Sequence, residues 1–125
     1  MFVMAAKIKD FSLEKPYLID AEPLREAVKD FCRERDWQPY HTPKNLMLAL
    51  VGEVGELAEI FQWATDEECL AFRQDPAQWA HINEEIADVL IYLMSLSNTL
   101  GVDLDYAVRD KLIKNARKYP APAGD

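Results

Sequence analysis

Two long segments of the sequence, residues 42–63 and 75–99, repeat apolar residues at alternating spacings of three and four. This spacing places side chains on one face of an α-helix. In each segment a neighbouring stripe with the same spacing carries a pair of carboxylates among its apolar residues. Two adjacent stripes are more than a lone antiparallel helix pair can cover. We therefore predict an all-α fold with a four-helix bundle core, in which two long antiparallel helices carry the acidic pairs and chains associate into a homo-oligomer.

Capping residues predict where the helices begin and end. Ser, Thr, Asp and Asn accept hydrogen bonds from the free N–H groups of a first turn, and glycine commonly follows a last turn. The expected helices are residues 20–36, 42–63, 65–73, 75–99 and 103–118. Their caps are Asp20, Thr42, Thr65 with Glu68 in a capping box, Asp75 and Asp103, and Gly101 stops the helix before it. Around one helical domain at 20–120 we expect an irregular segment at 1–19 and a mobile tail at 121–125, with a loop at 37–41 inside the domain.

The acidic pairs lie in a stretch with almost no basic residues. Between Lys44 and Arg109 the chain has twelve acidic residues and one basic residue, Arg73. Residues three apart share a helix face, so paired carboxylates repel each other unless a cation lies between them. Antiparallel helices would bring the two pairs together, and such hard oxygen ligands suit Mg²⁺, with Mn²⁺ as a substitute. The pairs are Glu53 with Glu56 and Glu85 with Asp88.

A metal ion held by these carboxylates predicts phosphate chemistry, because a bound divalent ion can hold a polyphosphate and activate water. The alternative for such pairs is a solvated acidic helix face. That alternative is less favoured here, since the pairs recur on two consecutive long helices, within apolar stripes and without basic partners. Glu59, three residues after Glu56, is a candidate for binding a second metal or for orienting the attacking water.

The net charge of −8 argues against DNA or RNA polymers and anionic membranes as partners, because both attract basic surfaces. Cys32 and Cys69 lack the spacing of metal ligands and predict free thiols in a reducing compartment. The apolar stretch at the start is too short for a signal peptide, and no run of about 18 apolar residues predicts a membrane span. We expect a soluble cytoplasmic protein.

The acidic pairs belong to a longer set of characteristic positions. Glu53-x-x-Glu56, followed after 28 residues by Glu85-x-x-Asp88, resembles the signature of the MazG-like all-α nucleoside triphosphate pyrophosphohydrolases. Over roughly residues 20–120 the chain is similar to the dCTP pyrophosphatase branch of that family. The similar positions are Arg35-Asp36-Trp37, His41-x-Pro43-Lys44-Asn45, residues 50–59, Phe61-Gln62-Trp63, residues 84–93, Lys111, Asn115 and Tyr119-Pro120.

This resemblance implies a dimer or a dimer of dimers that cleaves a nucleotide between its α- and β-phosphates. The implied Mg²⁺ ligands are Glu53, Glu56, Glu85 and Asp88. The implied nucleotide pocket is lined by Trp37, His41, Trp63 and Tyr92, with phosphate contacts from Lys111 and Asn115. The animal dCTP pyrophosphatases have a histidine where this chain has Val28, so its base preference stays open.

Lys44 and Asn45 are candidate substrate contacts for a separate reason, because they lie in the first turn of an expected helix, where the helix dipole favours anions. We expect a Mg²⁺-dependent enzyme that hydrolyses a (d)NTP, with dCTP or modified dCTP favoured, to the monophosphate and pyrophosphate in nucleotide-pool cleansing. Glu56 and Glu59 are its candidate catalytic residues. Two alternatives stay open, a non-catalytic acidic helical interaction module and a di-iron carboxylate protein. The second is less favoured, because neither histidine follows a glutamate by three residues.

Overall fold

The structure, a computed structural model, describes residues 17–123, and these residues form helices and no strands. The all-α prediction is therefore confirmed for this part of the chain. The chain divides into two compact units, residues 24–101 in one and residues 1–23 with 102–125 in the other. No single helix among the described residues is long and apolar enough to cross a membrane. The pair Pro76–Leu100 and Leu104–Lys118, which is bent at its connection, meets the length and composition criteria only when the two helices are taken together.

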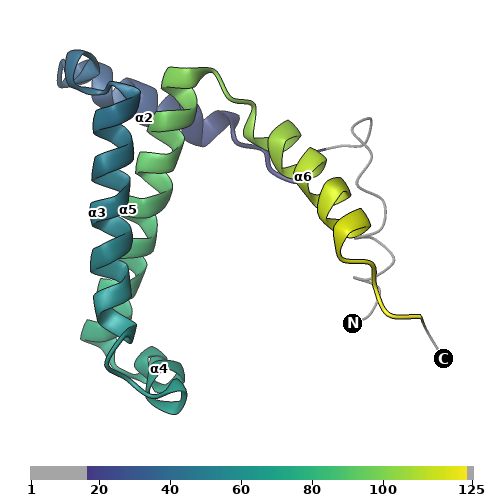
Figure 1. Ribbon diagram of the computed structural model, residues 1–125. Coiled ribbons are helices and arrows are strands. Elements are labelled where there is room, and N and C mark those ends of the chain that lie inside the picture. Colours follow the sequence, from purple (N-terminus) through teal and green to yellow (C-terminus); the bar gives the residue numbers. More distant parts are fainter. Residues whose placement is uncertain (1–16, 124–125) are drawn as a thin grey trace. The chain divides into compact units, whose positions relative to one another are not determined.

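The unit of residues 24–101 is built on two long antiparallel helices, α3 (Pro43–Phe61) and α5 (Pro76–Leu100), which lie side by side (Figure 1). Helix α2 (Glu22–Glu34) lies at the end of this pair where α3 begins, and α4 (Asp66–Ala71) lies at the opposite end. Two 3-10 turns, η1 (Gln38–Tyr40) and η2 (Phe72–Gln74), lie in the connections. The side-chain amide of Asn98 donates to the backbone oxygen of Arg25 over 3.3 Å and so links α5 to α2.

Side-chain caps account for most of the helix boundaries. Thr42 accepts a hydrogen bond from the backbone N–H of Asn45, and Asp75 accepts from the N–H groups of Ala77 and Gln78. Thr65 and Glu68 form the predicted capping box at α4. Gly101 ends α5 with a φ of 75°, the left-handed conformation that favours glycine. These caps are confirmed.

Two local predictions differ from the structure. Helix α2 begins at Glu22, so Asp20 does not directly precede its first turn. The segment expected to be a plain loop contains the 3-10 turn η1, with hydrogen bonds from Tyr40 N to Trp37 O and from His41 N to Gln38 O. Pro39 favours this tight turn, because its ring holds φ near the value that a 3-10 helix needs.

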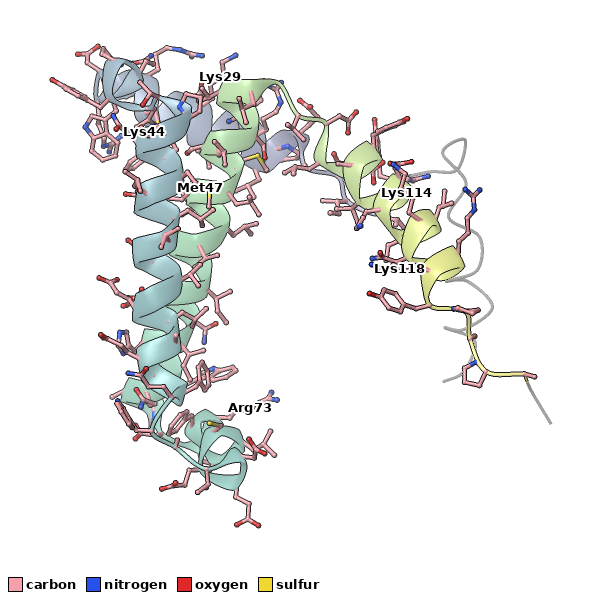
Figure 2. The ribbon with its side chains drawn as sticks, viewed as in Figure 1. Lys29, Lys44, Met47, Arg73, Lys114 and Lys118 are labelled. Carbon is pink, nitrogen blue, oxygen red and sulfur yellow. The ribbon has the colours of Figure 1, made fainter. Side chains whose placement is uncertain are left out.

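The apolar residues of the two long helices are only partly covered within this unit. Leu46 and Leu50 on α3 and Ile82 and Met94 on α5 are buried. Other apolar residues of the same helices stay exposed. They include Met47 (Figure 2), Val54, Ile86 and Leu93, which are 46%, 47%, 52% and 39% exposed. One chain therefore leaves apolar surface uncovered on this helix pair, and the four-helix bundle core and the homo-oligomer stay predictions.

The other unit contains α6 (Leu104–Lys118), which begins after its predicted cap Asp103. The backbone N–H groups of Leu18 and Ile19 donate to Asp105 over 2.7 and 2.9 Å, and Asp105 also pairs with buried Arg109 at 3.0 Å. Burial acts to raise the pKa of Asp105, but these hydrogen bonds and the guanidinium outweigh it and lower the pKa. One carboxylate thus holds Leu18 and Ile19 to α6. The rest of the expected irregular segment, residues 1–16, and the end of the tail, residues 124–125, lie outside the described residues.

Candidate functional site

Three carboxylates meet between α3 and α5. One oxygen each of Glu53, Glu56 and Glu85 lie within 4.8 Å of one another. The spacing of three residues puts the first two on one face of α3, and the antiparallel packing brings Glu85 opposite them. Asp88, one turn further along α5, lies outside this closest group, but its charge acts on Glu53. The four predicted metal ligands therefore gather in one place, three of them tightly.

The carboxyl group of Glu53 is crowded by neighbouring acidic groups. Burial first, and then the neighbouring carboxyl groups of Glu56, Asp88 and Glu85, raise the pKa of Glu53 to about 7. Oxygen Oε2 of Glu53 and oxygen Oε2 of Glu85 are both buried and have no hydrogen-bond partner among the described residues. Buried polar atoms normally have a partner. A hard divalent cation would satisfy both oxygens and offset the crowded charge, so this donor set fits a metal ion.

A polar hollow of about 540 Å³ lies on one side of the carboxylate group. It is lined by Glu56, Glu59, Ile60, Gln78, His81 and Glu85. His81 Nε2 lies 3.5 Å from Glu85 Oε1, and the Glu85 side chain is only 12% exposed. Candidate Glu59 thus shares a hollow with two of the carboxylates, where water or phosphate oxygens could lie between them.

An apolar hollow of about 480 Å³ adjoins the carboxylates through Asp88. It is lined by Leu24, Ala27, Val28, Phe31, Cys32, Trp37, His41, Asp88, Ile91, Tyr92 and Ser95. Three of the four residues predicted for the nucleotide pocket, Trp37, His41 and Tyr92, therefore come together here. With a metal ion held by the carboxylates, a hollow with aromatic walls beside them suits a ligand that has a flat ring at one end and negative charge at the other.

The end of α2 places Trp37 in this hollow. Asp36 has a φ of 54°, a left-handed conformation that Asp tolerates at a helix end, and the N–H of Trp37 then donates back to Cys32 O over 3.0 Å. The Trp37 ring packs edge-on against Phe31, with ring centroids 5.6 Å apart, and lies 6.0 Å from the His41 ring. Trp37 nevertheless stays 42% exposed, so one part of the ring is free to contact a ligand.

Three other predicted substrate contacts lie elsewhere in this unit. Lys44 is exposed in the first turn of α3, at the end of the helix pair that also carries Lys29 (Figure 2). The side-chain amide of Asn45 donates to Tyr40 O over 3.0 Å, so it holds η1 against α3. Trp63 is 87% exposed beyond the other end of α3, and the 19 residues of that helix span about 28 Å. One chain therefore does not bring Trp63 into the apolar hollow, and its contact with a substrate stays a prediction.

Lys111 and Asn115 belong to the other unit, on α6. Lys111 is exposed, and the backbone oxygen of Asn115 accepts the N–H of Tyr119 at the end of the helix. Their predicted phosphate contacts stay predictions.

Several lining residues carry no signal in the sequence. Cys32 and Ser95 lie on different helices, and their side chains are hydrogen-bonded to each other in the wall of the apolar hollow. Only the packing of α2 against α5 brings them together. His81 is different, because its spacing of four residues from Glu85 on one helix does predict a contact.

Comparisons with known proteins agree with this geometry. Residues 49–125 match the model of the MazG-like family. The chain is 51% identical over 100 residues to dCTP pyrophosphatase 1 of Homo sapiens, which covers 80% of this chain and 59% of that protein. It is 47% identical over 109 residues to dCTP pyrophosphatase 1 of Bos taurus, with 84% and 64% covered. The chain thus spans less than two thirds of the length of these two relatives.

A solved structure shares the fold. The crystal structure of a pyrophosphatase from Archaeoglobus fulgidus superposes with a TM-score of 0.72 at 40% sequence identity, and the match covers 86% of this chain and 98% of that one. Together with the family match and the curated relatives, it confirms the resemblance seen in the acidic pairs and their surroundings. The chain belongs to the MazG-like family.

Proposed function

We propose that this protein is a Mg²⁺-dependent nucleoside triphosphate pyrophosphohydrolase that converts dCTP or a modified dCTP to the monophosphate and pyrophosphate. The observation that carries the proposal is the group of Glu53, Glu56 and Glu85 within 4.8 Å, with two buried oxygens that lack a protein partner. The aromatic hollow that adjoins this group supports a nucleotide substrate. The names of the relatives, dCTP pyrophosphatase and pyrophosphatase, support the reaction and the base.

In this proposal Glu53, Glu56, Glu85 and Asp88 hold Mg²⁺, and the bound ion supplies charge neutralisation for the phosphate oxygens. Trp37 and Tyr92 hold the base in the apolar hollow, and a stacked ring typically contributes about 1–3 kcal/mol. Lys44, Asn45, Trp63, Lys111 and Asn115 are further substrate contacts of the proposal. Nucleotide-pool cleansing in the cytoplasm is the proposed setting, to which free Cys32 and Cys69 are suited.

The hydrolytic step is assigned to the polar hollow. Glu59 orients a water molecule there, and Glu56 or Glu59 accepts its proton as the oxygen attacks one phosphorus in line. The bond between that phosphorus and the bridging oxygen breaks, and pyrophosphate leaves. His81 contacts Glu85 Oε1 and holds that carboxylate in place from the side away from the apolar hollow.

The proposal includes a homo-oligomer, a dimer or a tetramer. Its support is the apolar surface that one chain leaves uncovered on α3 and α5, which includes Met47, Val54, Ile86 and Leu93. A second copy that packs its own long helix pair on this surface would complete a four-helix bundle. Light scattering of the purified protein tests this part, and a monomer at micromolar concentration would contradict it.

The function is tested by assaying pyrophosphate release from a panel of (d)NTPs with and without Mg²⁺. Glu56→Ala and Asp88→Asn should abolish turnover while the helical circular dichroism is unchanged. Glu84→Ala is the matched control, because Glu84 is an exposed neighbour of Glu85 outside the carboxylate group. Near-normal turnover by Glu56→Ala would contradict the assignment. Bound iron with oxidase activity would favour the di-iron alternative, and stability independent of metal with no turnover would favour the interaction module.

A further inference from the structure

A second hollow, of about 250 Å³, lies next to the apolar one and shares part of its wall. The shared residues are Val28, Cys32, His41 and Ser95. The apolar hollow continues toward Trp37, Tyr92 and Asp88, whereas the second is lined by the polar side chains of Gln38, Asn98 and Thr99 and by the basic residues Arg25 and Lys29. A ring held between the two hollows would have its flat faces against apolar side chains and its edge toward hydrogen-bonding groups.

Asn98 lines the second hollow and has a buried acceptor without a hydrogen-bond partner among the described residues. Its Nδ2 donates to the backbone oxygen of Arg25 over 3.3 Å, which determines which end of the amide is the nitrogen. Its Oδ1 is buried and has no hydrogen-bond partner among the described residues. A buried amide oxygen of this kind normally accepts at least one hydrogen bond. Asn98 Oδ1 can therefore accept a hydrogen bond from a donor group of a ligand.

Three neighbouring polar side chains, Thr99, Cys32 and Ser95, already have partners. Thr99 Oγ1 donates to the backbone oxygen of His41 over 3.4 Å. Burial raises the pKa of the Cys32 thiol despite its hydrogen bond with Ser95 and the charge of Arg35, so the thiol stays neutral. The basic residues Arg25 and Lys29 line the second hollow beside this wall, and the buried Asn98 Oδ1 is an acceptor without a hydrogen-bond partner among the described residues.

We propose that Asn98 Oδ1 accepts a hydrogen bond from the exocyclic amino group of a cytosine base, and that it thereby selects cytosine over uracil and thymine. The inference rests on the proposed function, whose base pocket it deepens. Cytosine presents an N–H donor at the 4-position, where uracil and thymine present a carbonyl oxygen. A carbonyl facing Asn98 Oδ1 would place two acceptors together and leave both unsatisfied. Sites built to pair with a substrate donor reject analogues that lack it much more strongly than apolar pockets reject a missing methyl group.

The test compares pyrophosphate release from three substrates by the full chain with Mg²⁺. These are dCTP, dUTP and the 2′-deoxyribosyl triphosphate of pyrimidin-2-one, which is cytosine without its amino group. The wild type should prefer dCTP to the other two by roughly ten- to a hundred-fold in kcat/KM. Asn98→Ala should lower kcat/KM for dCTP by a similar factor and leave the value for the pyrimidin-2-one substrate nearly unchanged.

The ratio of dCTP to pyrimidin-2-one separates base recognition from a merely structural role. If Asn98 only tied α5 to α2, Asn98→Ala would lower both values by the same factor, and the inference would be overturned. Asn83→Ala is the matched control, because Asn83 also donates from its amide to a backbone oxygen, that of Trp79 at 2.7 Å, on the same helix and on an exposed surface. It should keep the wild-type ratio.

Two further results keep the inference testable on its own. If Asn98→Ala does not fold, equal rates of the wild type on dCTP and on the pyrimidin-2-one substrate overturn it. Calorimetric measurement of how the non-hydrolysable α,β-imido analogues bind separates the role of Asn98 from the proposed hydrolysis. Preferential binding of the amino base without turnover would support the role of Asn98 and refute the proposed hydrolysis, whereas turnover without preference would refute only the role of Asn98.

Discussion

Replacing Glu53 by glutamine should stabilise the metal-free protein. Glu53 is crowded by Glu56 and Glu85, whose oxygens lie within 4.8 Å, and by the charge of Asp88. Two unit charges 4.8 Å apart repel by about 3.5 kcal/mol at an effective dielectric constant of about 20, and by about 0.9 kcal/mol in bulk water. The substitution keeps the shape of the side chain and removes one charge. We therefore expect a gain in the free energy of unfolding of about 1–3 kcal/mol at pH 8 in EDTA.

The pH dependence of this gain identifies its cause. The folded pKa of Glu53, about 7, lies above its ordinary value of 4.5. The contribution of this group to stability is therefore fully present below pH 4.5 and is lost as the pH rises through about 7. At pH 5 the folded wild type already holds the proton, so Glu53→Gln should gain little there. The difference between variant and wild type should grow from pH 5 to pH 8.

The assay is thermal unfolding at one protein concentration, in EDTA and in excess Mg²⁺. About 1 kcal/mol corresponds to roughly 4 °C in Tm for a domain of this size. In excess Mg²⁺ the wild type should have a higher Tm than Glu53→Gln, because the wild type gains stability from the bound ion and the variant has lost one ligand. Glu84→Gln, an exposed charge on α5, is the control and should show no such dependence. A lower Tm for Glu53→Gln in EDTA at pH 8, or an equal gain at pH 5 and pH 8, would refute the reasoning.

Two other perturbations follow from single side chains. Trp37→Ala should raise KM for dCTP about ten- to a hundred-fold with little change in kcat, because it removes a stacking surface. Steady-state kinetics checks this, and Trp79→Ala, which has the same 42% exposure but lies outside both hollows, should leave KM unchanged. Gly101→Ala should lower the free energy of unfolding in urea by about 1 kcal/mol, since a Cβ is strained at a φ of 75°. Gly101→Asn should lower the free energy of unfolding by less than Gly101→Ala. A Gly101→Ala variant as stable as the wild type would contradict the importance of the left-handed conformation at residue 101.

The parts of this structure that depend on neighbours in sequence were predictable. The caps at Thr42, Thr65, Asp75 and Asp103 need only a hydrogen bond to the next turn, and all four form. The carboxylate group was predictable as well, because the spacing of three residues fixes each pair and an antiparallel partner aligns them.

Features that depend on packing between elements were not predictable from one sequence. The walls shared by the two hollows join Val28 and Cys32 of α2 to Ser95 of α5, and nothing in their spacing indicates that meeting. Trp63 depends on packing beyond one chain. It follows the end of α3 and is 87% exposed, so its contact with a substrate stays a prediction.

In the proposals above, one helix, α5, carries a residue for each end of the substrate, Asp88 for the metal-bound phosphates and Asn98 for the base. Asp88 and Asn98 lie on α5 ten residues apart, which corresponds to about 15 Å along the axis at 1.5 Å per residue. An unbroken helix keeps this separation between the metal-binding residue and the base-binding residue constant. Free cytosine or inorganic pyrophosphate is too short to contact both residues at once. The proposed site therefore favours binding of a whole nucleotide over either of its fragments.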